Sequence, residues 1–322
     1  MKTAILAALC ASLVPAAALA QSAASFPSKP ITIIVPATAG GAIDITARLI
    51  GQKLGEAWGK PVVIENKGGA TGTIGTDAVA KAPPDGHTLV LVASSHAINP
   101  SMFKTLPYDT VKGFEPVILT HVVPLMLVVT NSLPPKTLPE LIAYGRSKPG
   151  ELTFASSGSG GAPHMSGELF RSMAKVDMLH VPYKGSTAAH ADLLSGRTSL
   201  MFDTVAAINP HVKAGSVRAL AVTTAKRSAA APEVPTMAEA GLTGYETSTW
   251  GGVLAPAGTP KDIVAKLNAE FNRDLNLPDV HRKLTDAGIE PAGGSPQHFA
   301  DFIQAEMQKW AKVAKDARVE PE

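Results

Sequence analysis

Short apolar runs alternate along the chain with stretches in which apolar residues recur every three or four positions. The first run, residues 31–35, consists of isoleucine, threonine and valine, the β-branched residues that favour a strand. After a short loop, Ile43, Ala47, Ile50 and Leu54 share one face of a predicted helix, and polar residues occupy the other faces. This alternation of strands and helices is typical of an α/β fold with parallel strands and crossover helices.

The same alternation fills two stretches of the chain, which we interpret as two lobes. In the first stretch we predict strands at residues 61–65 and 88–93 and a helix at residues 73–81. In the second stretch a capping box, Thr137 with Glu140, opens a helix that ends near residue 148. The further elements predicted there are helices at residues 163–173 and 187–194 and strands at residues 152–155, 178–183, 200–203 and 218–223.

A long apolar segment, residues 116–130, separates the two stretches and contains Pro124. Because proline cannot donate a backbone hydrogen bond within a sheet, we predict that this segment forms two strands that cross between the lobes. Residues 245–254 are predicted to return the chain to the first lobe, and the remainder is helical. The predicted lobes are residues 27–124 with 246–322, and residues 125–245.

The first twenty residues have the pattern of a signal peptide. Lys2 precedes an apolar run, and Ala18-Leu19-Ala20 forms a cleavage site before Gln21. The run is shorter than the roughly 20 residues that span a bilayer. Cys10 follows Leu9, where lipid attachment signals require a small residue. We therefore expect a soluble protein that is exported to the periplasm and, after cleavage, contains no cysteine.

The composition excludes several classes of function. The chain carries 29 basic and 27 acidic residues, a balance that argues against nucleic acid as a partner. Its 28 glycines and 26 prolines imply more turns than a helical bundle contains. The nine histidines are scattered, without the H-E-x-x-H spacing of a zinc enzyme. We expect neither a metal nor a cofactor.

The most informative residues are two glycine-rich loops, loop 1 (residues 36–44) and loop 2 (residues 156–164), each between a predicted strand and a predicted helix. The first turn of a helix has unpaired N–H groups and a partial positive charge, and glycine lets a ligand approach the backbone. Together these features favour an anion. One such loop is often only a tight turn, but one in each lobe favours a shared anion held between them.

Two other interpretations of these loops are weaker. Pro163 stands where a nucleotide-binding G-x-G-x-x-G motif requires its third glycine. A serine hydrolase with Ser157 or Ser159 as nucleophile remains an alternative, although the surrounding residues miss the G-x-S-x-G pattern by one position.

Motifs along nearly the whole chain resemble the periplasmic solute receptors of tripartite tricarboxylate transporters, known as Bug receptors. The resemblance rests on a series of motifs in the family's order: Pro36 with Gly40-Gly41 and Asp44 before Ala47-Arg48, Glu65-Asn66 with Gly68-Gly69, Pro84-Asp85-Gly86, residues 95–100, Leu106-Pro107-Tyr108, Ser156-Ser157-Gly158 with His164, residues 181–185 and residues 219–223.

This resemblance implies a two-lobed, type II-like periplasmic binding protein with two crossover strands and a ligand cleft between the lobes. It implies that both loops hold one carboxylate of the ligand, largely through backbone N–H groups and water. The implied binding residues are Thr38, Gly40, Gly41 and Asp44 in loop 1, Ser156, Ser157, Gly158, Ser159, Gly160 and His164 in loop 2, and Gly185, Ser186 and Asp203 at the far end. Ala37 and Gly161 depart from the family pattern, which usually has an aromatic residue and often a serine there.

Three of these residues also have structural interpretations. Asp44 lies where an acid stabilises the helix dipole, and its charge would repel a carboxylate, so we expect contact only through water or with a ligand amino group. His164 serves equally well as a local hydrogen-bond partner. Asp203 ends a predicted strand, where a polar side chain either faces a ligand or has a structural role.

The expected function is capture of a small organic acid by hinge closure, for delivery to integral-membrane transporter subunits. A ligand sensor for a signalling partner is the alternative. We expect a monomer.

Overall fold

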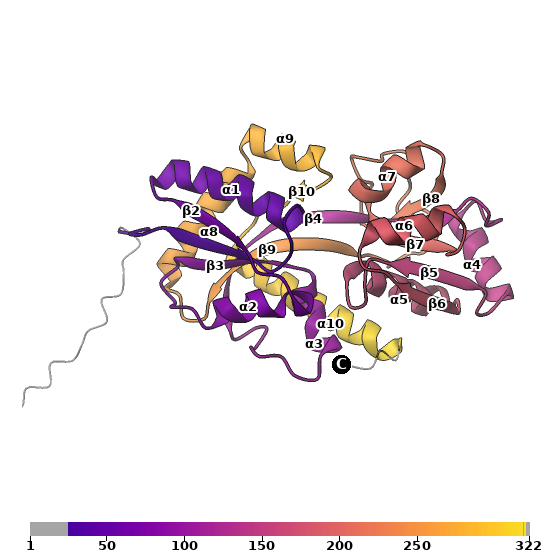
Figure 1. The fold of residues 1–322 in the computed structure, drawn as a ribbon, viewed down its shortest axis with the longest axis horizontal. Helices are drawn as coiled ribbons and strands as arrows, with labels where there is room; N and C mark the ends of the chain where they lie inside the picture. The colour runs from indigo at the N-terminus through magenta and orange to yellow at the C-terminus, as the bar shows by residue number, and fades with distance from the viewer. Residues whose placement is uncertain (1–24, 318, 320–322) are drawn as a thin grey trace, which may run out of the picture.

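The computed structural model describes residues 25–317 and 319 and consists of two α/β lobes joined by extended strands (Figure 1). The described part of the chain therefore begins after the predicted signal peptide, residues 1–20, which lies outside it. None of the helices in that part is long and apolar enough to cross a membrane. The two-lobed α/β architecture confirms the predicted fold class.

Lobe 1 is built from both ends of the described chain. Its N-terminal elements are β1 (Ile31–Val35), α1 (Ala42–Trp58), β2 (Val62–Asn66), the 3-10 turn η1 (Ala70–Gly72), α2 (Thr73–Ala80), β3 (Thr88–Ala93) and α3 (Ser95–Met102). Its C-terminal elements are β9 (Ser248–Pro256), α8 (Lys261–Leu275), α9 (Pro278–Asp286), β10 (Glu290–Pro291) and α10 (Pro296–Asp316).

Lobe 2 is formed by the middle of the chain. It contains α4 (Leu138–Ser147), β5 (Leu152–Ser156), α5 (Ala162–Ala174), β6 (Met178–Pro182), α6 (Ser186–Leu194), β7 (Leu200–Thr204), α7 (Val205–Lys213) and β8 (Val217–Val222). The helices predicted after β5 and β6 form there, each following directly from a glycine-containing loop.

A single strand, β4 (Phe114–Thr130), runs through both lobes. Up to Pro124 it pairs with β9, and from Leu125 it pairs with β7 and, one residue later, with β8. The prediction of two strands divided by Pro124 is therefore wrong. The proline is tolerated because it lies where β4 changes partners.

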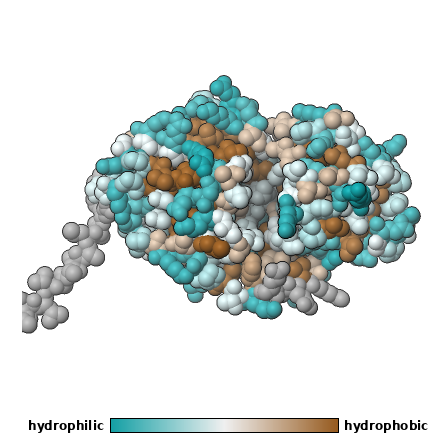
Figure 2. Space-filling model, viewed as in Figure 1, coloured by the Kyte–Doolittle hydropathy of each residue, from teal (hydrophilic) through white to brown (hydrophobic). Residues whose placement is uncertain are grey.

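The ends of the parallel strands in the two lobes face each other across this junction. In lobe 1, β1 pairs in parallel with β2 and β3, and Ala93 at the end of β3 lies opposite Gly251, close to the crossover. In lobe 2, β5 pairs in parallel with β6 and β7, and Thr204 at the end of β7 lies opposite Leu125. The loops that follow these strands therefore border the groove between the lobes, which is visible in Figure 2.

The predicted apolar stripes form the cores of the lobes. Ile43, Ala47, Ile50 and Leu54 of α1 are all buried, in one cluster with β1 and α8. Burying an aliphatic side chain of this size contributes about 1.5–3 kcal/mol, so such stripes are the main source of stability. Trp310 of α10 is also fully buried, and its indole donates to Glu306 at 2.9 Å.

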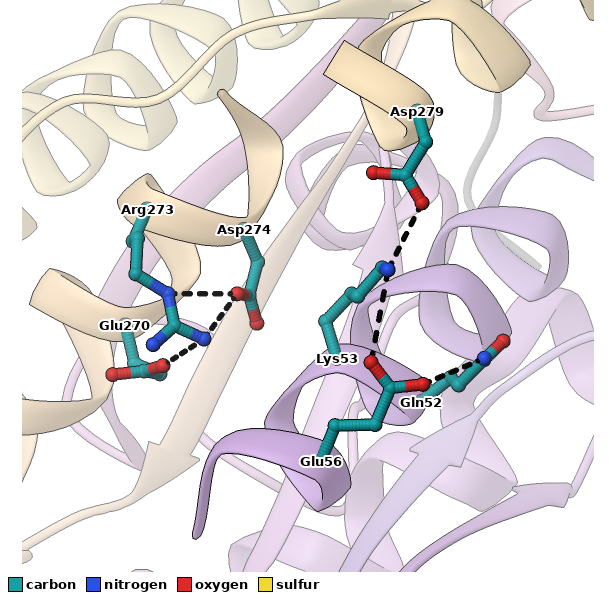
Figure 3. Close-up of polar contacts among 7 residues, drawn as sticks. All are labelled: Gln52, Lys53, Glu56, Glu270, Arg273, Asp274 and Asp279. Carbon is teal, nitrogen blue, oxygen red and sulfur yellow. Dashed lines mark hydrogen bonds and ion pairs between the residues drawn. The ribbon is translucent and has the colours of Figure 1, made fainter. Parts of the chain in front are cut away.

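Figure 3 shows ion pairs of lobe 1, one of which connects α1 to α9. Lys53 of α1 lies 2.9 Å from Asp279 of α9 and 3.6 Å from Glu56. Arg273 pairs with the buried carboxylate of Asp274, whose pKa is raised by burial despite this partner. Partly exposed pairs such as Lys53–Asp279 contribute little, about 0–1 kcal/mol, so they support a fold that the core already specifies.

Candidate functional site between the lobes

Loop 1 and loop 2 end in the same backbone conformation although they lie in different lobes. Gly40 has φ 91° and is followed by Gly41 with φ -81° and ψ 170°, directly before α1. Gly160 has φ 74° and is followed by Gly161 with φ -81° and ψ 164°, directly before α5. Neither helix has a side-chain cap at its first residue. Each loop therefore presents an open helix N-terminus at the end of a strand.

Asp44 holds loop 1 in this shape. Its Oδ2 atom accepts hydrogen bonds from the Gly40 amide at 2.9 Å and from Nε of Arg48 at 3.1 Å, and its Oδ1 atom accepts one from Asn66 at 2.9 Å. Burial opposes ionisation, but the hydrogen bonds from Arg48, Gly40 and Asn66 outweigh it and lower the pKa of Asp44. The carboxylate is only 3% exposed, so the geometry agrees with the structural interpretation of this residue.

His164 has the equivalent position in loop 2. Its Nδ1 atom accepts a hydrogen bond from the Gly160 amide at 3.1 Å, and its ring stacks on His180 with 3.9 Å between centroids. Nε2 of His180 lies 2.7 Å from the hydroxyl of Ser156, which also contacts the backbone of Gly158. Burial and the neighbouring His164 and Arg171 lower the pKa of His180 to about 3, so the His180 ring is uncharged at neutral pH.

These contacts determine which amides are available to a ligand. The N–H groups of Gly40, Gly158 and Gly160 are used within the loops, so these predicted residues do not offer free amides. Free amides are offered instead by the first turns of α1 and α5. Among the backbone bonds of the described residues, none pairs the amides of Ala42, Ile43, Asp44, Ala162 or His164. The donors thus lie slightly further along the chain than the glycines themselves.

The loop after β2 lies next to both glycine loops. A Cβ atom on Gly68 would lie 3.4 Å from the carbonyl carbon of Ala37, so this loop packs against loop 1. Its residue Thr71 borders a small cavity of about 30 Å³ between the lobes. The other residues around this cavity are Asn99, Met102 and Phe103 of lobe 1 and Ser159 and Gly160 of loop 2. Loop 2 therefore meets lobe 1 at this point, with residues 68–72 between it and loop 1.

Gly185 and Ser186 lie at the start of α6, beside loop 2, and Asp203 contacts this start from β7. The Gly185 amide donates to the carbonyl oxygen of Ser157 at 3.1 Å. Asp203, at the end of β7, accepts from the Ser186 hydroxyl at 3.0 Å and lies 2.7 Å from Nε2 of His190. Through these contacts Asp203, which is only 2% exposed, joins α6 to β7.

Four predicted residues are exposed, and they include Gly40 and Gly41 of loop 1. The other two are Thr38 in loop 1 and Ser159 in loop 2, whose side chains are accessible from solvent. Ser156 is the serine that contacts a histidine, but it is fully buried, whereas Ser159 has no such partner among the described residues. Among the described residues, loop 2 therefore brings no exposed serine beside a histidine.

Sequence reasoning missed several residues of this region. His180 lies outside every motif, and only the fold brings it to His164. A second cavity, of about 540 Å³, lies between α7 and the end of α9 and was also not anticipated. Within residues 25–317 and 319, no group of three or more potential ligands is placed to hold a metal ion.

Comparisons with known proteins agree with this geometry. The sequence pattern described as the tripartite tricarboxylate transporter family receptor matches residues 46–319. A relative from a Pseudomonas species, a UPF0065 protein in the tcbD-tcbE intergenic region, is 41% identical over 98% of this chain and 94% of its own length.

Solved structures show the same fold. The R. palustris protein Rpa4515, solved with adipate, has a TM-score of 0.80 and 42% identity, covering 92% of this chain and 100% of its own. MatC from Rhodopseudomonas palustris, solved with bound malate, has a TM-score of 0.76 and 37% identity, covering 89% and 99% of the two chains.

Proposed function

The chain belongs to the family of tripartite tricarboxylate transporter receptors, as its motifs predicted, and from this premise we propose that it captures one small dicarboxylate between its lobes. The closed, ligand-bound form would then be recognised by the membrane subunits of such a transporter.

The observation that carries this proposal is the pair of open helix N-termini. α1 and α5 belong to different lobes, start from the same backbone conformation and lack side-chain caps. Side chains cap the first turns of α4 and α10, whereas the other described α-helices also start without such a cap, so what distinguishes α1 and α5 is the shared glycine conformation at the ends of facing strands. An open first turn offers N–H donors and a partial positive charge, which together stabilise a carboxylate.

A dicarboxylate fits better than a monocarboxylate because a third open helix start lies beside loop 2. α6 begins after Gly185 without a side-chain cap, and Gly185 is hydrogen-bonded to Ser157. One carboxylate would bind between α1 and α5, and the second would lie toward α6. The relatives solved with adipate and malate, both dicarboxylates, support this choice.

The remaining features of the proposal follow the family. The chain would be exported by the signal peptide at residues 1–20, act in the periplasm as a monomer, and perform no catalysis. Thr38, Gly41, Ser157 and Ser159 would contact the ligand or its water, whereas Asp44, His164 and Asp203 would hold the loops that do. Delivery to a sensor protein uses the same closed shape and remains the alternative.

Binding to the native state raises the melting temperature, which provides the test. The purified protein is unfolded in guanidinium, dialysed and refolded to remove any bound acid, and then melted with adipate, malate and a series of other dicarboxylates. The diamide of each acid serves as an uncharged control of the same size. We expect at least one dicarboxylate to raise the melting temperature in a saturable manner and its diamide to have no effect. If no carboxylate raises the melting temperature of the refolded protein, the proposal is wrong.

A further inference from the structure

The turn between β2 and α2 has a strained backbone. Ala70 has φ 46° and Thr71 has φ 53° and ψ 34°, so two consecutive residues other than glycine adopt the left-handed conformation. This conformation is unfavourable for residues with a side chain, and for β-branched threonine it is a genuine outlier. Such strain persists only where the surroundings enforce it, and it is concentrated at ligand-binding and switch segments.

The surroundings of the turn do enforce it. The buried amide of Asn99 donates to the carbonyl oxygen of Thr71 at 3.2 Å. Gly72 donates to the carbonyl oxygen of Gly69 at 3.0 Å, and a Cβ atom on Gly72 would lie 3.3 Å from the carbonyl oxygen of Pro36. Contacts with α3 and with loop 1 thus hold the turn in this conformation.

The hydroxyl of Thr71 differs from those of its neighbours. Thr73 donates its hydroxyl to the carbonyl oxygen of Ala70 at 2.9 Å, and Thr76 donates to Gly72 at 2.8 Å. Thr71 is exposed, and its hydroxyl makes no hydrogen bond with the rest of the described chain. Thr71 is one of the residues that line the cavity of about 30 Å³, together with Ser159 and Gly160 of loop 2 from the other lobe.

We infer that Thr71 is a ligand-contacting and specificity-determining residue, which its strained turn holds between loop 1 and loop 2. The hydroxyl donates to an oxygen of the bound dicarboxylate, and the methyl group limits the width of the ligand beside Ser159. This inference rests on the proposed function and adds a contact from a segment outside both glycine loops. It also explains why the strain is retained, since the left-handed turn directs residue 71 toward the opposite lobe.

Variants of Thr71 separate the hydroxyl from the shape of the side chain. Thr71→Val has the same shape without the hydroxyl, and Thr71→Ser keeps the hydroxyl without the methyl group. Thr71→Gly removes the side chain and the strain together, so it keeps the test decisive if Thr71→Val does not fold. Thr243→Val serves as a matched control, because Thr243 is also exposed but lies in lobe 2 next to Gly244, which packs near Met173 at the far end of α5.

Calorimetry with the dicarboxylate that binds the wild type most tightly provides the measurement. A hydrogen bond to a charged group is worth roughly a factor of 10 in affinity or more. We therefore expect Thr71→Val and Thr71→Gly to weaken binding about ten-fold, and Thr71→Ser and Thr243→Val to stay within about two-fold of the wild type. We also expect Thr71→Gly to melt at a higher temperature than the wild type, because it relieves the strain.

The possible failures are distinguishable. If the wild type binds a dicarboxylate and both Thr71→Val and Thr71→Gly bind it equally well, the inference is overturned and the proposed function stands. If the wild type binds no carboxylate, the proposed function itself fails, and the inference fails with it.

Discussion

The backbone amide of Gly160 donates a hydrogen bond to Nδ1 of His164 over 3.1 Å. Loop 1 contains the same bond with a different acceptor, since the Gly40 amide donates to Asp44 over 2.9 Å. In each loop, the third residue of the helix accepts the amide of the glycine that precedes the N-cap. An imidazole in one lobe and a carboxylate in the other thus fix the same backbone shape, which leaves the first-turn amides open to the groove.

His164 should support ligand binding through its acceptor atom. In His164→Ala the Gly160 amide loses its partner, and we expect the affinity for the dicarboxylate to fall about ten-fold because loop 2 no longer keeps its shape. Asn places an acceptor oxygen where Nδ1 lies, as Asp44 does in loop 1, so His164→Asn should bind within about three-fold of the wild type. Calorimetry on both variants checks this, and equal affinities of the Ala and Asn variants would show that the acceptor is irrelevant.

Asp44 should contribute mainly to stability. Asp44→Ala leaves the Gly40 amide and the side chain of Asn66 without their shared acceptor, and losing a buried partner of this kind costs about 1–3 kcal/mol in the free energy of unfolding. Asp44→Asn keeps one acceptor oxygen and should lose less. Denaturant titration measures both values. A stability of Asp44→Ala equal to that of the wild type would contradict the role assigned to this carboxylate.

The two glycines of loop 1 should respond differently to alanine. Gly40 has a positive φ, so Gly40→Ala introduces strain of about 1–2 kcal/mol. Gly41 has an extended conformation, and a Cβ atom there would meet no atom within 4 Å, so Gly41→Ala should fold with unchanged stability. Its methyl group would instead project into open space beside the first turn of α1 and weaken ligand binding. Melting temperature and affinity, measured together, distinguish the two effects, and an undiminished affinity of Gly41→Ala would place the ligand elsewhere.

The elements of the fold were largely predictable because their apolar periodicity is local information. The strand at residues 31–35 and the stripe from Ile43 to Leu54 are examples. The helix α7, from Val205 to Lys213, was missed because it is short and contains Pro210, and it owes its burial to β4 and β8. β4 was divided at Pro124 because the sequence does not show where a strand changes partners.

The site was predictable to a similar extent. The glycine loops and helix starts are visible as motifs, but the identity of the free amides depends on which acceptors the fold supplies. Nothing in the sequence joins His180 to His164 or Asn99 to Thr71, since these contacts arise from packing between distant segments.

Buried histidines should make the protein less stable as the pH falls below 6.5. Burial lowers the pKa of His96 to about 4 and that of His121 to about 3, and burial with nearby His164 and Arg171 lowers the pKa of His180 to about 3. Between pH 6.5 and about 4 these side chains are neutral in the folded state and protonated in the unfolded state. Unfolding then takes up protons, so the free energy of unfolding decreases with falling pH, by about 1.4 kcal/mol per pH unit for each histidine at most.

Denaturant titrations at pH 7, 6 and 5 measure this dependence. His121→Asn removes one of the three groups and should reduce the slope by about one proton per molecule. A free energy of unfolding that is constant from pH 7 to 5 would contradict the neutral, buried state of these histidines.

Amide NMR of the refolded, ligand-free protein shows whether amides from both lobes bind one carboxylate. On titration with the dicarboxylate that raises the melting temperature, the amide signals of Ala42 and Ile43 in α1 and of Ala162 and His164 in α5 should move together, with one common dissociation constant. If the signals of only one lobe move, or if those of both lobes remain in place while the ligand binds, the carboxylate is not shared between the two helix N-termini.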